Sequence, residues 1–297
     1  SGSVTVTGLE KLVVDATASS IQGTVLSGSS VQVSANAASA TGTLTANVAS
    51  SDTTLDFSSL TLSTAAASSV AGMTLATDAS ANSGVMTITG ATGMKNTITG
   101  GTAADTLTGG LKVDTFVYSG DDKLFNSDNE MIDTAVSGST GTDILQLGTS
   151  GTAVEIEADD DFSNLSSVEN LVVSSNSAYI SISLGTTAET AGIVTVDLSA
   201  DTTTGDANVI NVAAYTAAAT TLIGSADAET ITGGAGVDTI TGGAGSDTLS
   251  GGAGNDIFVF AASGDLFSGT SGTAADASIN GGDGVDILKI GGSATAF

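Results

Sequence analysis

The sequence predicts an all-β protein, a parallel β-solenoid built from repeated modules, with little or no helix. Two observations carry this prediction: a nine-residue repeat in strict phase, and a composition unlike that of ordinary globular proteins. Of 297 residues 39 are Gly, and the chain contains no Pro, Cys, His, Trp or Arg. The abundance of Ala, Thr and Ser among the rest favours thin, repetitive β structure over helices.

The repeat is clearest in the stretch GGAGVDTITGGAGSDTLSGGAGNDIFVF, residues 233–260. Three adjacent copies within it match G-G-x-G-x-D-x-U-x, where U is a large apolar residue. Three matches in one phase exclude an accident of composition. We call residues 224–259 the second roll and the weaker copy at residues 91–117 the first roll; single repeats recur at 138–146 and 281–289.

Each residue type in the repeat has a physical role. Gly takes the backbone angles of a tight turn and lets carbonyl oxygens approach a ligand closely. Asp offers a hard carboxylate, and the next three residues form a short strand whose middle side chain turns inward. That inward position holds an apolar ladder: Leu222, Ile231, Ile240, Leu249 and Phe258 in the second roll, and Ile98, Leu107 and Phe116 in the first.

Nine residues make half a turn of such a coil, so alternate repeats stack on the same side. Asp238 and Asp256 are therefore expected on one side, and Glu229 and Asp247 on the other. Stacked carboxylates without a cation would repel one another across a strand spacing of about 5 Å. Oxygen ligands without His or Cys suit Ca²⁺ rather than zinc or copper.

The charge of the chain points the same way. Its 32 acidic residues outnumber 5 basic ones and give a net charge of −27, which repels nucleic acid and anionic membranes and attracts cations. The longest apolar run, residues 257–262, is far too short to span a membrane. We therefore expect several Ca²⁺ ions as cofactors, and neither nucleic acid nor a membrane interior as a partner.

These nonapeptides resemble the hemolysin-type calcium-binding repeats of RTX proteins, which form a parallel β-roll with Ca²⁺ between successive turns. The second roll matches strongly and the first less so. The chain departs from the pattern at Glu229 in the second roll and at Asn96 in the first, and the loops around Lys95 and Lys112 of the first roll are poor in Gly. In that family the Asp carboxylate and the loop carbonyls are the ligands. By position, the resemblance implies these metal ligands: Asn96, Asp105, Asp114, Asp143, Glu229, Gly233, Gly234, Gly236, Asp238, Gly242, Gly243, Gly245, Asp247, Gly251, Gly252, Gly254, Asp256 and Asp286.

A larger repeat lies above the nonapeptides. DTFVY at 114–118 returns as DIFVF at 256–260, and TDILQLG at 142–148 returns as VDILKIG at 285–291. We expect a first module at 1–147, a second at 148–290 and the start of a third at 291–297. This arrangement indicates a piece cut from a longer repetitive polypeptide.

Alternating apolar and polar residues predict further strands between the rolls. No stretch has helical periodicity with caps, and only the Ala-rich runs near Ala65 and Ala217 are expected to form a short helical turn. The predicted strands are SVTVTG (3–8), VQVS (31–34), TGTLTANV (41–48), ISISLG (180–185), IVTVDLS (193–199) and NVINVA (208–213).

The composition argues against an enzyme, since the chain lacks the usual general base, thiol nucleophile and bidentate anion clamp. Its densest acidic group allows three interpretations: a carboxylate pair for glycoside cleavage, an extra Ca²⁺ site or a solvated loop. Rows of outward Thr also resemble ice-binding faces of other β-solenoids. The acidic group is Glu155, Glu157, Asp159, Asp160 and Asp161, and the Thr pairs are Thr97/Thr99, Thr106/Thr108, Thr230/Thr232 and Thr239/Thr241.

The RTX resemblance implies a secreted protein that folds when it meets Ca²⁺ outside the cell, after export by a type I system. Modules without catalytic residues resemble RTX-type S-layer proteins of the bacterial cell surface, which self-associate into a lattice. Surface polysaccharide is an anchoring partner by family analogy alone. Two alternatives remain open: the stalk or binding region of a giant RTX adhesin, and the RTX tail of a secreted lipase, protease or epimerase.

Overall fold

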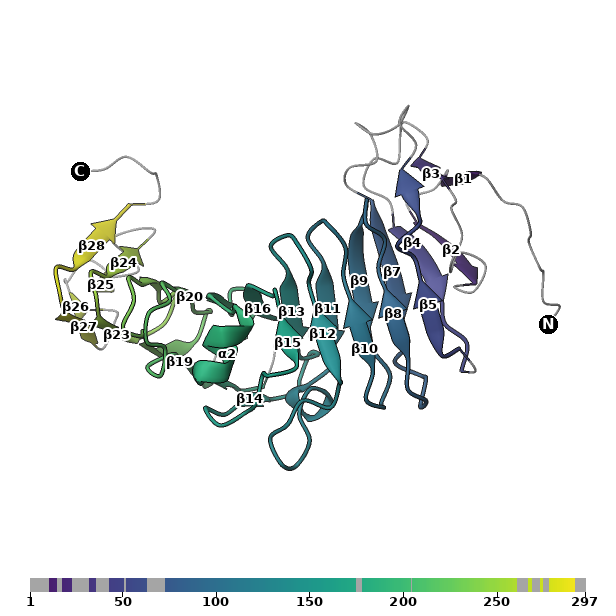
Figure 1. Cartoon of the computed structure of the whole chain (residues 1–297). Coiled ribbons are helices and arrows are strands. Elements are labelled where there is room, and N and C mark those ends of the chain that lie inside the picture. The colour runs from purple at the N-terminus through teal and green to yellow at the C-terminus, as the bar shows by residue number, and fades with distance from the viewer. Residues whose placement is uncertain are drawn as a thin grey trace. The chain divides into compact units, whose positions relative to one another are not determined.

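The computed structural model shows a nearly all-β chain of two compact units (Figure 1). Unit 1 comprises residues 1–118, 131–145 and 164–168, and unit 2 comprises residues 119–130, 146–163 and 169–297. The module boundaries expected from the sequence repeat remain a prediction. The structure describes residues 11–14, 18–22, 32–35, 43–50, 52–62, 73–174, 178–203, 205–260, 267–268, 273–274 and 278–291.

Unit 1 is built from parallel strands in two main sheets and a smaller third one. In the long sheet the order is β2 (Ala18–Gln22), β4 (Thr43–Asn47), β7 (Thr74–Asp78), β9 (Lys95–Thr99), β11 (Thr115–Tyr118) and β13 (Ile144–Leu147), which begins in this unit. The second sheet has the order β5 (Thr54–Asp56), β8 (Thr87–Thr89), β10 (Thr106–Thr108), β12 (Ala135–Ser137) and β15 (Leu165–Ser166). The third has the order β1 (Lys11–Val14), β3 (Gln32–Ala35) and β6 (Thr61–Leu62).

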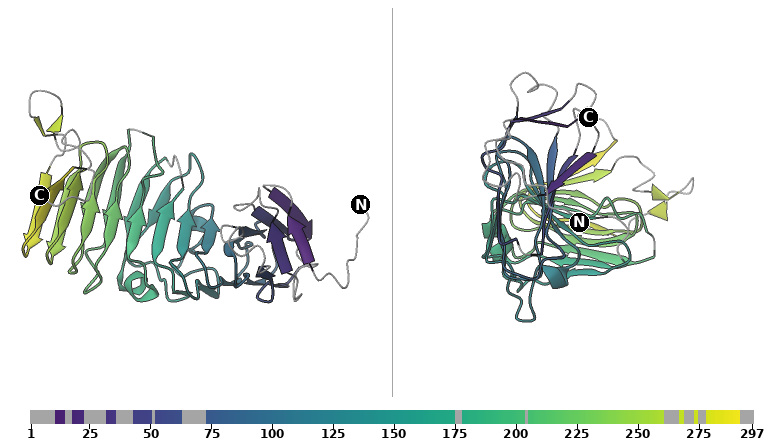
Figure 2. Two further views of the ribbon diagram at one scale, coloured as in Figure 1. Left: turned by 90° about the horizontal axis from the view of Figure 1, so that it is seen from above. Right: turned by 90° about the vertical axis from the view of Figure 1, so that its right-hand side faces the viewer.

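Unit 2 repeats the plan of two parallel sheets whose strands lie side by side (Figure 2). Its strands in the long sheet follow the order β16 (Asn170–Val173), β18 (Thr195–Asp197), β20 (Thr221–Ile223), β22 (Thr239–Thr241), β24 (Ile257–Phe260) and β28 (Ile287–Ile290). The second sheet has the order β14 (Val154–Ile156), β17 (Ile180–Ser183), β19 (Ala207–Asn211), β21 (Ala228–Thr232), β23 (Thr248–Ala253) and β27 (Ser278–Asp283). The other elements described are the antiparallel pair β25 (Phe267–Ser268) and β26 (Thr273–Ala274), the 3-10 helix η1 (Asp121–Lys123) and the α-helix α2 (Thr186–Ala191).

The apolar ladder of the second roll forms the core of its coil. Leu222, Ile240 and Phe258 are in register on neighbouring strands of the long sheet. Ile231 and Leu249 pair in the same way on the opposite sheet. None of these five side chains is more than 2% exposed. Successive nonapeptides thus alternate between the two sheets, and the prediction of nine residues per half turn is confirmed.

The first roll follows the same arrangement. Ile98 on β9 is in register with Phe116 on β11 in the long sheet. Leu107 on β10 lies between Ile88 on β8 and Val136 on β12 in the second sheet. All of these side chains are buried. The predicted solenoid with an inward apolar column is therefore correct for this roll too.

The α-helix α2 (Thr186–Ala191) lies where none was expected, and is labelled in Figure 1. Its end is set by Gly192, whose left-handed φ of 107° lets its N–H bond the carbonyl oxygens of Ala188 and Glu189. The expected helical turn near Ala217 is wrong. The N–H groups of residues 216–218 bind the Glu189 carboxylate instead, at 2.9 to 3.1 Å. The run near Ala65 lies outside the described residues.

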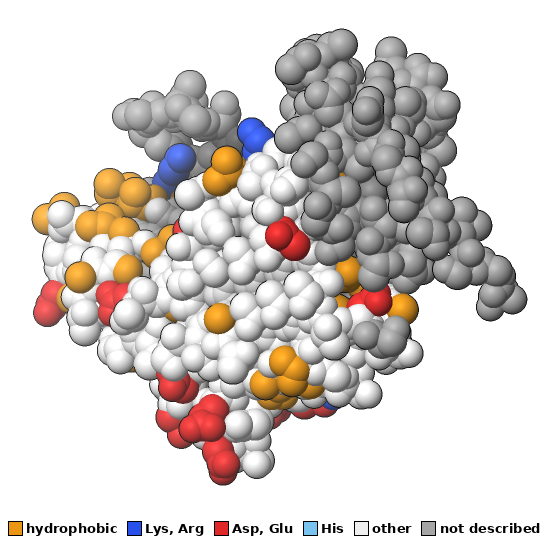
Figure 3. Space-filling view, turned by 45° about the vertical axis from the view of Figure 1, so that its right-hand side comes forward, with side chains coloured by type: hydrophobic (Ala, Val, Ile, Leu, Met, Phe, Trp, Pro, Cys, Tyr) orange, Lys and Arg blue, Asp and Glu red, His pale blue; other side chains and the backbone are white. Residues whose placement is uncertain are grey.

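The predicted strands between the rolls fall on β3, β4, β17, β18 and β19, whereas SVTVTG lies outside the described residues. The alternation of apolar and polar residues predicts these strands because one face of each strand packs inward, as the buried Ile180 and Ile182 show. On the face drawn in Figure 3, most of the described surface is backbone and uncharged polar side chains. Within the described ranges, no helix is long and apolar enough to cross a membrane.

Candidate metal centre

The loops of the nonapeptides in unit 2 stack in two columns. Loops 233–238, 251–256 and 281–286 precede β22, β24 and β28 in one sheet, and loops 224–229 and 242–247 precede β21 and β23 in the other. Hydrogen bonds link loops within a column. The N–H of Ala253 donates to the Gly234 carbonyl at 2.9 Å, and that of Ala244 to the Ser225 carbonyl at 3.0 Å.

Glycine is required where one loop passes over another. Gly245 and Gly254 have left-handed φ values of 126° and 119°. A Cβ on Gly245 would collide with the carbonyl oxygen of Asp227, and one on Gly254 with that of Gly236. The second glycines of these loops, Gly243 and Gly252, are also left-handed and also lie against carbonyl oxygens of the loop before. Backbone oxygens of one loop thus face the next at a distance that no side chain allows.

The nonapeptide carboxylates lie inside the coil. Asp105, Asp114, Asp143, Asp238 and Asp256 are 0% exposed, and Glu229 and Asp247 are at most 2% exposed. One oxygen of each Asp accepts a backbone N–H from the preceding coil on the same side. The pairs are Met86 N–H to Asp105 Oδ1 (2.8 Å), Asn96 to Asp114 (2.7 Å), Asp114 to Asp143 (2.7 Å), Thr220 to Asp238 (2.8 Å), Glu229 to Asp247 (2.9 Å) and Asp238 to Asp256 (2.9 Å). The sequence did not predict this structural role for Asp.

The same bonds place the acidic residues on two sides. Asp238 and Asp256 are linked in one column, and Glu229 and Asp247 in the other, as the half-turn spacing predicts. Asp286 extends the first column, accepting the Asp256 N–H at 3.0 Å, but is only half buried.

The second carboxylate oxygens differ between loops. Oδ2 accepts a hydrogen bond from its own loop in Asp105 (Gly101 N–H, 2.6 Å), Asp238 (Gly234 N–H, 2.8 Å) and Asp114 (Gly110 N–H). By contrast, Glu229 Oε2 and Asp256 Oδ2 are buried with no hydrogen-bond partner among the described residues. The α-carbon of Gly251 lies beside both Asp256 Oδ2 and the Gly281 carbonyl oxygen.

These oxygens fit a hard divalent cation. Carboxylate and carbonyl oxygens from successive coils converge without any nitrogen or sulfur donor, which is the ligand type of Ca²⁺. Burial raises the pKa of Asp256. Burial, with a smaller contribution from the charge of Asp247, also raises the pKa of Glu229 to about 7, although hydrogen bonds from Ser225 oppose this. A bound cation would offset the desolvation that raises both pKa values.

Asn96 is placed with the carboxylates but makes different contacts. Its Oδ1 accepts the Ala91 N–H at 2.8 Å. Its Nδ2 donates to Asp114 Oδ1 at 2.7 Å and to the Ala91 carbonyl oxygen at 3.1 Å. Its role as a ligand stays a prediction, to which we return below.

Two buried polar residues in the coils beside these loops, Asp133 and Asn208, were not predicted. Asp133 accepts the Asp105 N–H at 2.9 Å and the Tyr118 hydroxyl at 2.5 Å. Asn208 accepts the Ile180 N–H at 3.0 Å and donates weakly to Asp227 at 3.4 Å. Asn208 stands two residues before the inward Ile210, the spacing of Asp in the nonapeptide, so extending the frame would have found it. Asp133 stands three residues before Val136, outside that frame.

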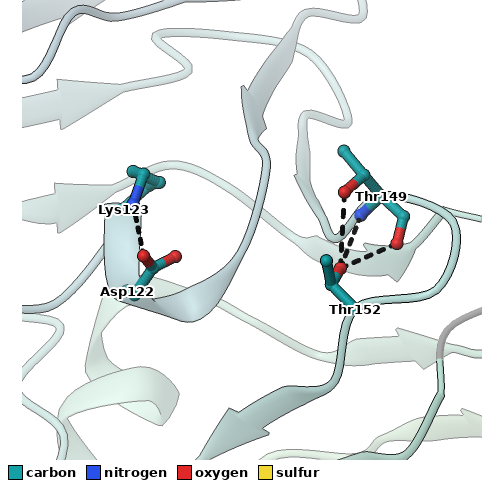
Figure 4. Close-up of polar contacts among 4 residues, drawn as sticks. All are labelled: Asp122, Lys123, Thr149 and Thr152. Atoms are coloured by element: carbon teal, nitrogen blue, oxygen red, sulfur yellow. Dashed lines mark hydrogen bonds and ion pairs between the residues drawn. The ribbon is translucent and has the colours of Figure 1, made fainter.

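The acidic group at 155–161 belongs to unit 2, with Glu155 on β14 and the other four residues in the segment that follows this strand. Asp160 Oδ2 accepts the Glu157 N–H at 2.9 Å, and Asp161 Oδ1 accepts the Ser163 N–H at 2.8 Å. Nearby, Lys123 pairs with Asp122, and Thr149 and Thr152 close a turn (Figure 4). Among the residues that the structure describes, no three acidic, His or Cys side chains converge as a metal-binding group. Any Ca²⁺ ion held here would therefore need backbone carbonyls, as in the nonapeptide loops.

Comparison with known families identifies the repeats. Residues 91–125 and 223–258 match the family model of the RTX calcium-binding nonapeptide repeat, with 4 copies. No curated protein and no solved structure matches the chain. The chain thus carries RTX-type repeats arranged as a parallel β-roll, and the ion that such repeats bind is Ca²⁺. Repeats of this kind are typical of secreted, extracellular proteins.

Proposed function

We propose that this chain is part of a Ca²⁺-dependent structural protein of the bacterial cell surface, an S-layer protein whose folded modules associate into a lattice. The observation that carries the proposal is the stack of RTX loops in unit 2. There, Glu229 Oε2 and Asp256 Oδ2 lie buried beside loop carbonyls, with no hydrogen-bond partner in the part of the chain that the structure describes. A structure of this kind is completed by cations, and its repetition suits a building block better than a single active site.

The ions would be held by Glu229, Asp238, Asp247, Asp256 and Asp286 in unit 2 and by Asp105 and Asp143 in unit 1, together with loop carbonyls. Asp114, also a ligand by its position in the repeat, already receives hydrogen bonds on both oxygens and is treated separately below. Bound Ca²⁺ would supply the positive charge that these buried carboxylates and loop carbonyls lack. The Asp carboxylates themselves hold the preceding coil through its N–H groups, and the glycines admit the carbonyls. These residues therefore couple ion binding to the stacking of coils.

In this proposal, folding responds to the difference in Ca²⁺ concentration between the inside and the outside of the cell. With Ca²⁺ scarce, repulsion within a chain of net charge −27 keeps much of it expanded, which suits type I export. Outside, sites with dissociation constants of about 10⁻⁴ to 10⁻³ M fill, and binding to the folded form alone drives folding. In this proposal the chain has no enzymatic activity, associates with copies of itself, and is anchored through surface polysaccharide.

Circular dichroism of the purified chain tests Ca²⁺-dependent folding. We expect strong β signal at millimolar Ca²⁺ and loss of much of it on addition of EGTA, with recovery when Ca²⁺ is restored. A matched Mg²⁺ sample controls for general screening of charge. Unchanged β content in EGTA would overturn the proposal.

The stalk of a large adhesin is the second candidate. One observation favours it: unit 2 adds coils along one direction, and Leu288, in register with the buried Phe258, is 48% exposed at the last described coil. An exposed apolar side chain in the core column suits contact with a further coil on the same axis. Electron microscopy of the Ca²⁺-loaded parent protein separates the candidates, because a lattice protein forms two-dimensional sheets and a stalk forms separate rods.

A further inference from the structure

We propose that the side-chain amide of Asn96 takes the place of a Ca²⁺ ion between loops 91–96 and 109–114, so that this part of the first roll stays folded when Ca²⁺ is removed. The inference rests on the proposed Ca²⁺-dependent folding of the remaining loops. It assigns Asn96 the opposite role from the one its position in the repeat implies.

The contacts of Nδ2 are those of a small cation. This atom lies within hydrogen-bond distance of three oxygens: Asp114 Oδ1 at 2.7 Å, the Ala91 carbonyl at 3.1 Å and the Met94 carbonyl at 3.4 Å. One is a carboxylate oxygen of the next coil, and two are carbonyl oxygens of the residue's own loop. This is the mixture of donors from stacked loops that the nonapeptide offers to an ion.

The amide orientation is fixed by its surroundings. Oδ1 accepts the Ala91 N–H at 2.8 Å, and the side chain is 1% exposed. Because Asp114 Oδ1 can only accept when ionised, the atom that faces it must be the donor Nδ2. The side chain also lies directly against the α-carbon of Gly90, which leaves no space for any larger residue there.

The neutral amide removes the need for a positive ion at this place. Asp114 Oδ1 is satisfied by the backbone N–H and Nδ2 of Asn96, and its Oδ2 by the Gly110 N–H. Every oxygen of this buried carboxylate thus has a partner from the protein. At the corresponding place in the second roll, Asp256 Oδ1 accepts the Asp238 N–H, and Asp256 Oδ2 has no hydrogen-bond partner among the described residues. Asp238 offers Asp256 no side-chain donor in the way that Asn96 does for Asp114 Oδ1.

A carboxylate at position 96 should restore the need for Ca²⁺. In Asn96→Asp, an ionised side chain of nearly the same shape would face Asp114 Oδ1 across 2.7 Å, and the two buried charges would repel unless a cation lies between them. Asn126→Asp is the matched control, because it adds the same charge at an exposed side chain whose Oδ1 accepts the Asp128 N–H at 2.8 Å and can still do so as Asp. It gives up only a 3.4 Å contact of Nδ2 with Glu130, and solvent screens the added charge because both side chains are exposed.

Hydrogen–deuterium exchange measured by mass spectrometry on the full chain, in Ca²⁺ and in EGTA, reads each roll separately. In the wild type, EGTA should leave peptides over β9 and β11 protected while those over β22 and β24 lose protection. In Asn96→Asp, protection over β9 and β11 should fall by about 100-fold in EGTA and return in Ca²⁺, with one more Ca²⁺ bound per chain in equilibrium dialysis. Asn126→Asp should behave as the wild type.

Two results would overturn the inference: loss of protection in EGTA over β9 and β11 of the wild type equal to that over β22 and β24, or an Asn96→Asp chain that exchanges like the wild type in EGTA. The first leaves Ca²⁺-dependent folding intact. If neither roll of the wild type responds to EGTA, the proposed function fails, and the exchange of Asn96→Asp in EGTA alone decides the inference.

Discussion

The first roll and the second roll share a nonapeptide but differ in how they satisfy their buried carboxylates. In the first roll, Asp105 and Asp114 receive hydrogen bonds on both oxygens from backbone and side-chain groups. In the second, Asp238 is likewise bonded on both oxygens, but Glu229 and Asp256 each keep one buried oxygen without a hydrogen-bond partner in the described residues. The comparison teaches that one repeat pattern builds both carboxylates that the protein satisfies by itself and carboxylates that are left for a cation.

The largest effect should separate Asp114→Ala from Asp256→Ala. Removing Asp114 strands three donors, the N–H and Nδ2 of Asn96 and the N–H of Gly110, so the free energy of unfolding should fall by about 3 kcal/mol or more with or without Ca²⁺. Removing Asp256 leaves the Asp238 N–H without its acceptor and also removes a proposed Ca²⁺ ligand. The free energy of unfolding of Asp256→Ala should therefore fall by more in Ca²⁺ than in EGTA. Urea unfolding in both conditions measures this, and equal Ca²⁺ dependence of the two variants would contradict the comparison.

A glycine pair tests the close passage of loops in unit 2. Gly254→Ala should lower the free energy of unfolding by about 3 kcal/mol, because it combines a left-handed backbone with a clash against the Gly236 carbonyl. Gly151→Ala, with φ of 83° and nothing within 4 Å of a new Cβ, should lose only about 1 kcal/mol. Thermal unfolding in Ca²⁺ measures both, and similar losses would show that the carbonyl stack is not a constraint.

Glu189 tests how the second roll begins. Its carboxylate accepts the N–H groups of Thr216, Ala217 and Ala218, next to the Ala218 carbonyl that faces Gly236. Burial alone would raise the pKa of Glu189, but these hydrogen bonds lower it overall. Glu189→Gln should cost about 1–2 kcal/mol in urea unfolding, and the exposed Glu157→Gln close to nothing. An unchanged free energy of unfolding for Glu189→Gln would show that these hydrogen bonds do not stabilise the start of the second roll.

The smallest effect expected is on pH dependence. Burial raises the pKa of Asp114, Asp256 and Glu229 in the folded protein. A carboxyl group of this kind stabilises the fold at pH values below its pKa in the unfolded chain. It loses that contribution as the pH rises through its pKa in the folded protein. In EGTA, the free energy of unfolding should therefore fall by about 1 kcal/mol between about pH 5 and pH 8. With Ca²⁺, which binds ionised carboxylates, the fall should shrink or reverse. Stability that rises with pH in EGTA would contradict this assignment.

Much of the fold followed from periodicity. The inward ladder, the half-turn spacing and the strands between the rolls were predictable because one face of every strand is buried and side chains alternate. Helix α2 was not, because six residues with three Thr carry no helical period and its end depends on Gly192. The prediction of a helical turn near Ala217 was wrong because the backbone N–H groups there donate to the carboxylate of Glu189, which lies 27 to 29 residues earlier in the chain.

The candidate site divides in the same way. Sequence spacing located the Asp residues and their two sides, because the repeat places one carboxylate in each half turn. Sequence spacing did not reveal that each Asp accepts an N–H from the coil before it, or that Asn96 acts as a donor. It also did not reveal that Asp133 accepts the Asp105 N–H of the first roll. Those contacts join residues that are 18 to 29 positions apart, and Asp133 lies outside the nonapeptide frame.

The sequence by itself determined the parallel β-roll, the apolar core column and the identity of the ion, since these depend on local spacing and on the chemistry of oxygen ligands. Only the tertiary structure decided which buried oxygens the protein satisfies by itself and which it leaves for a cation. The physical reason is that the partners of a buried carboxylate come from the coils stacked above and below it, and no repeat pattern states what those neighbours donate.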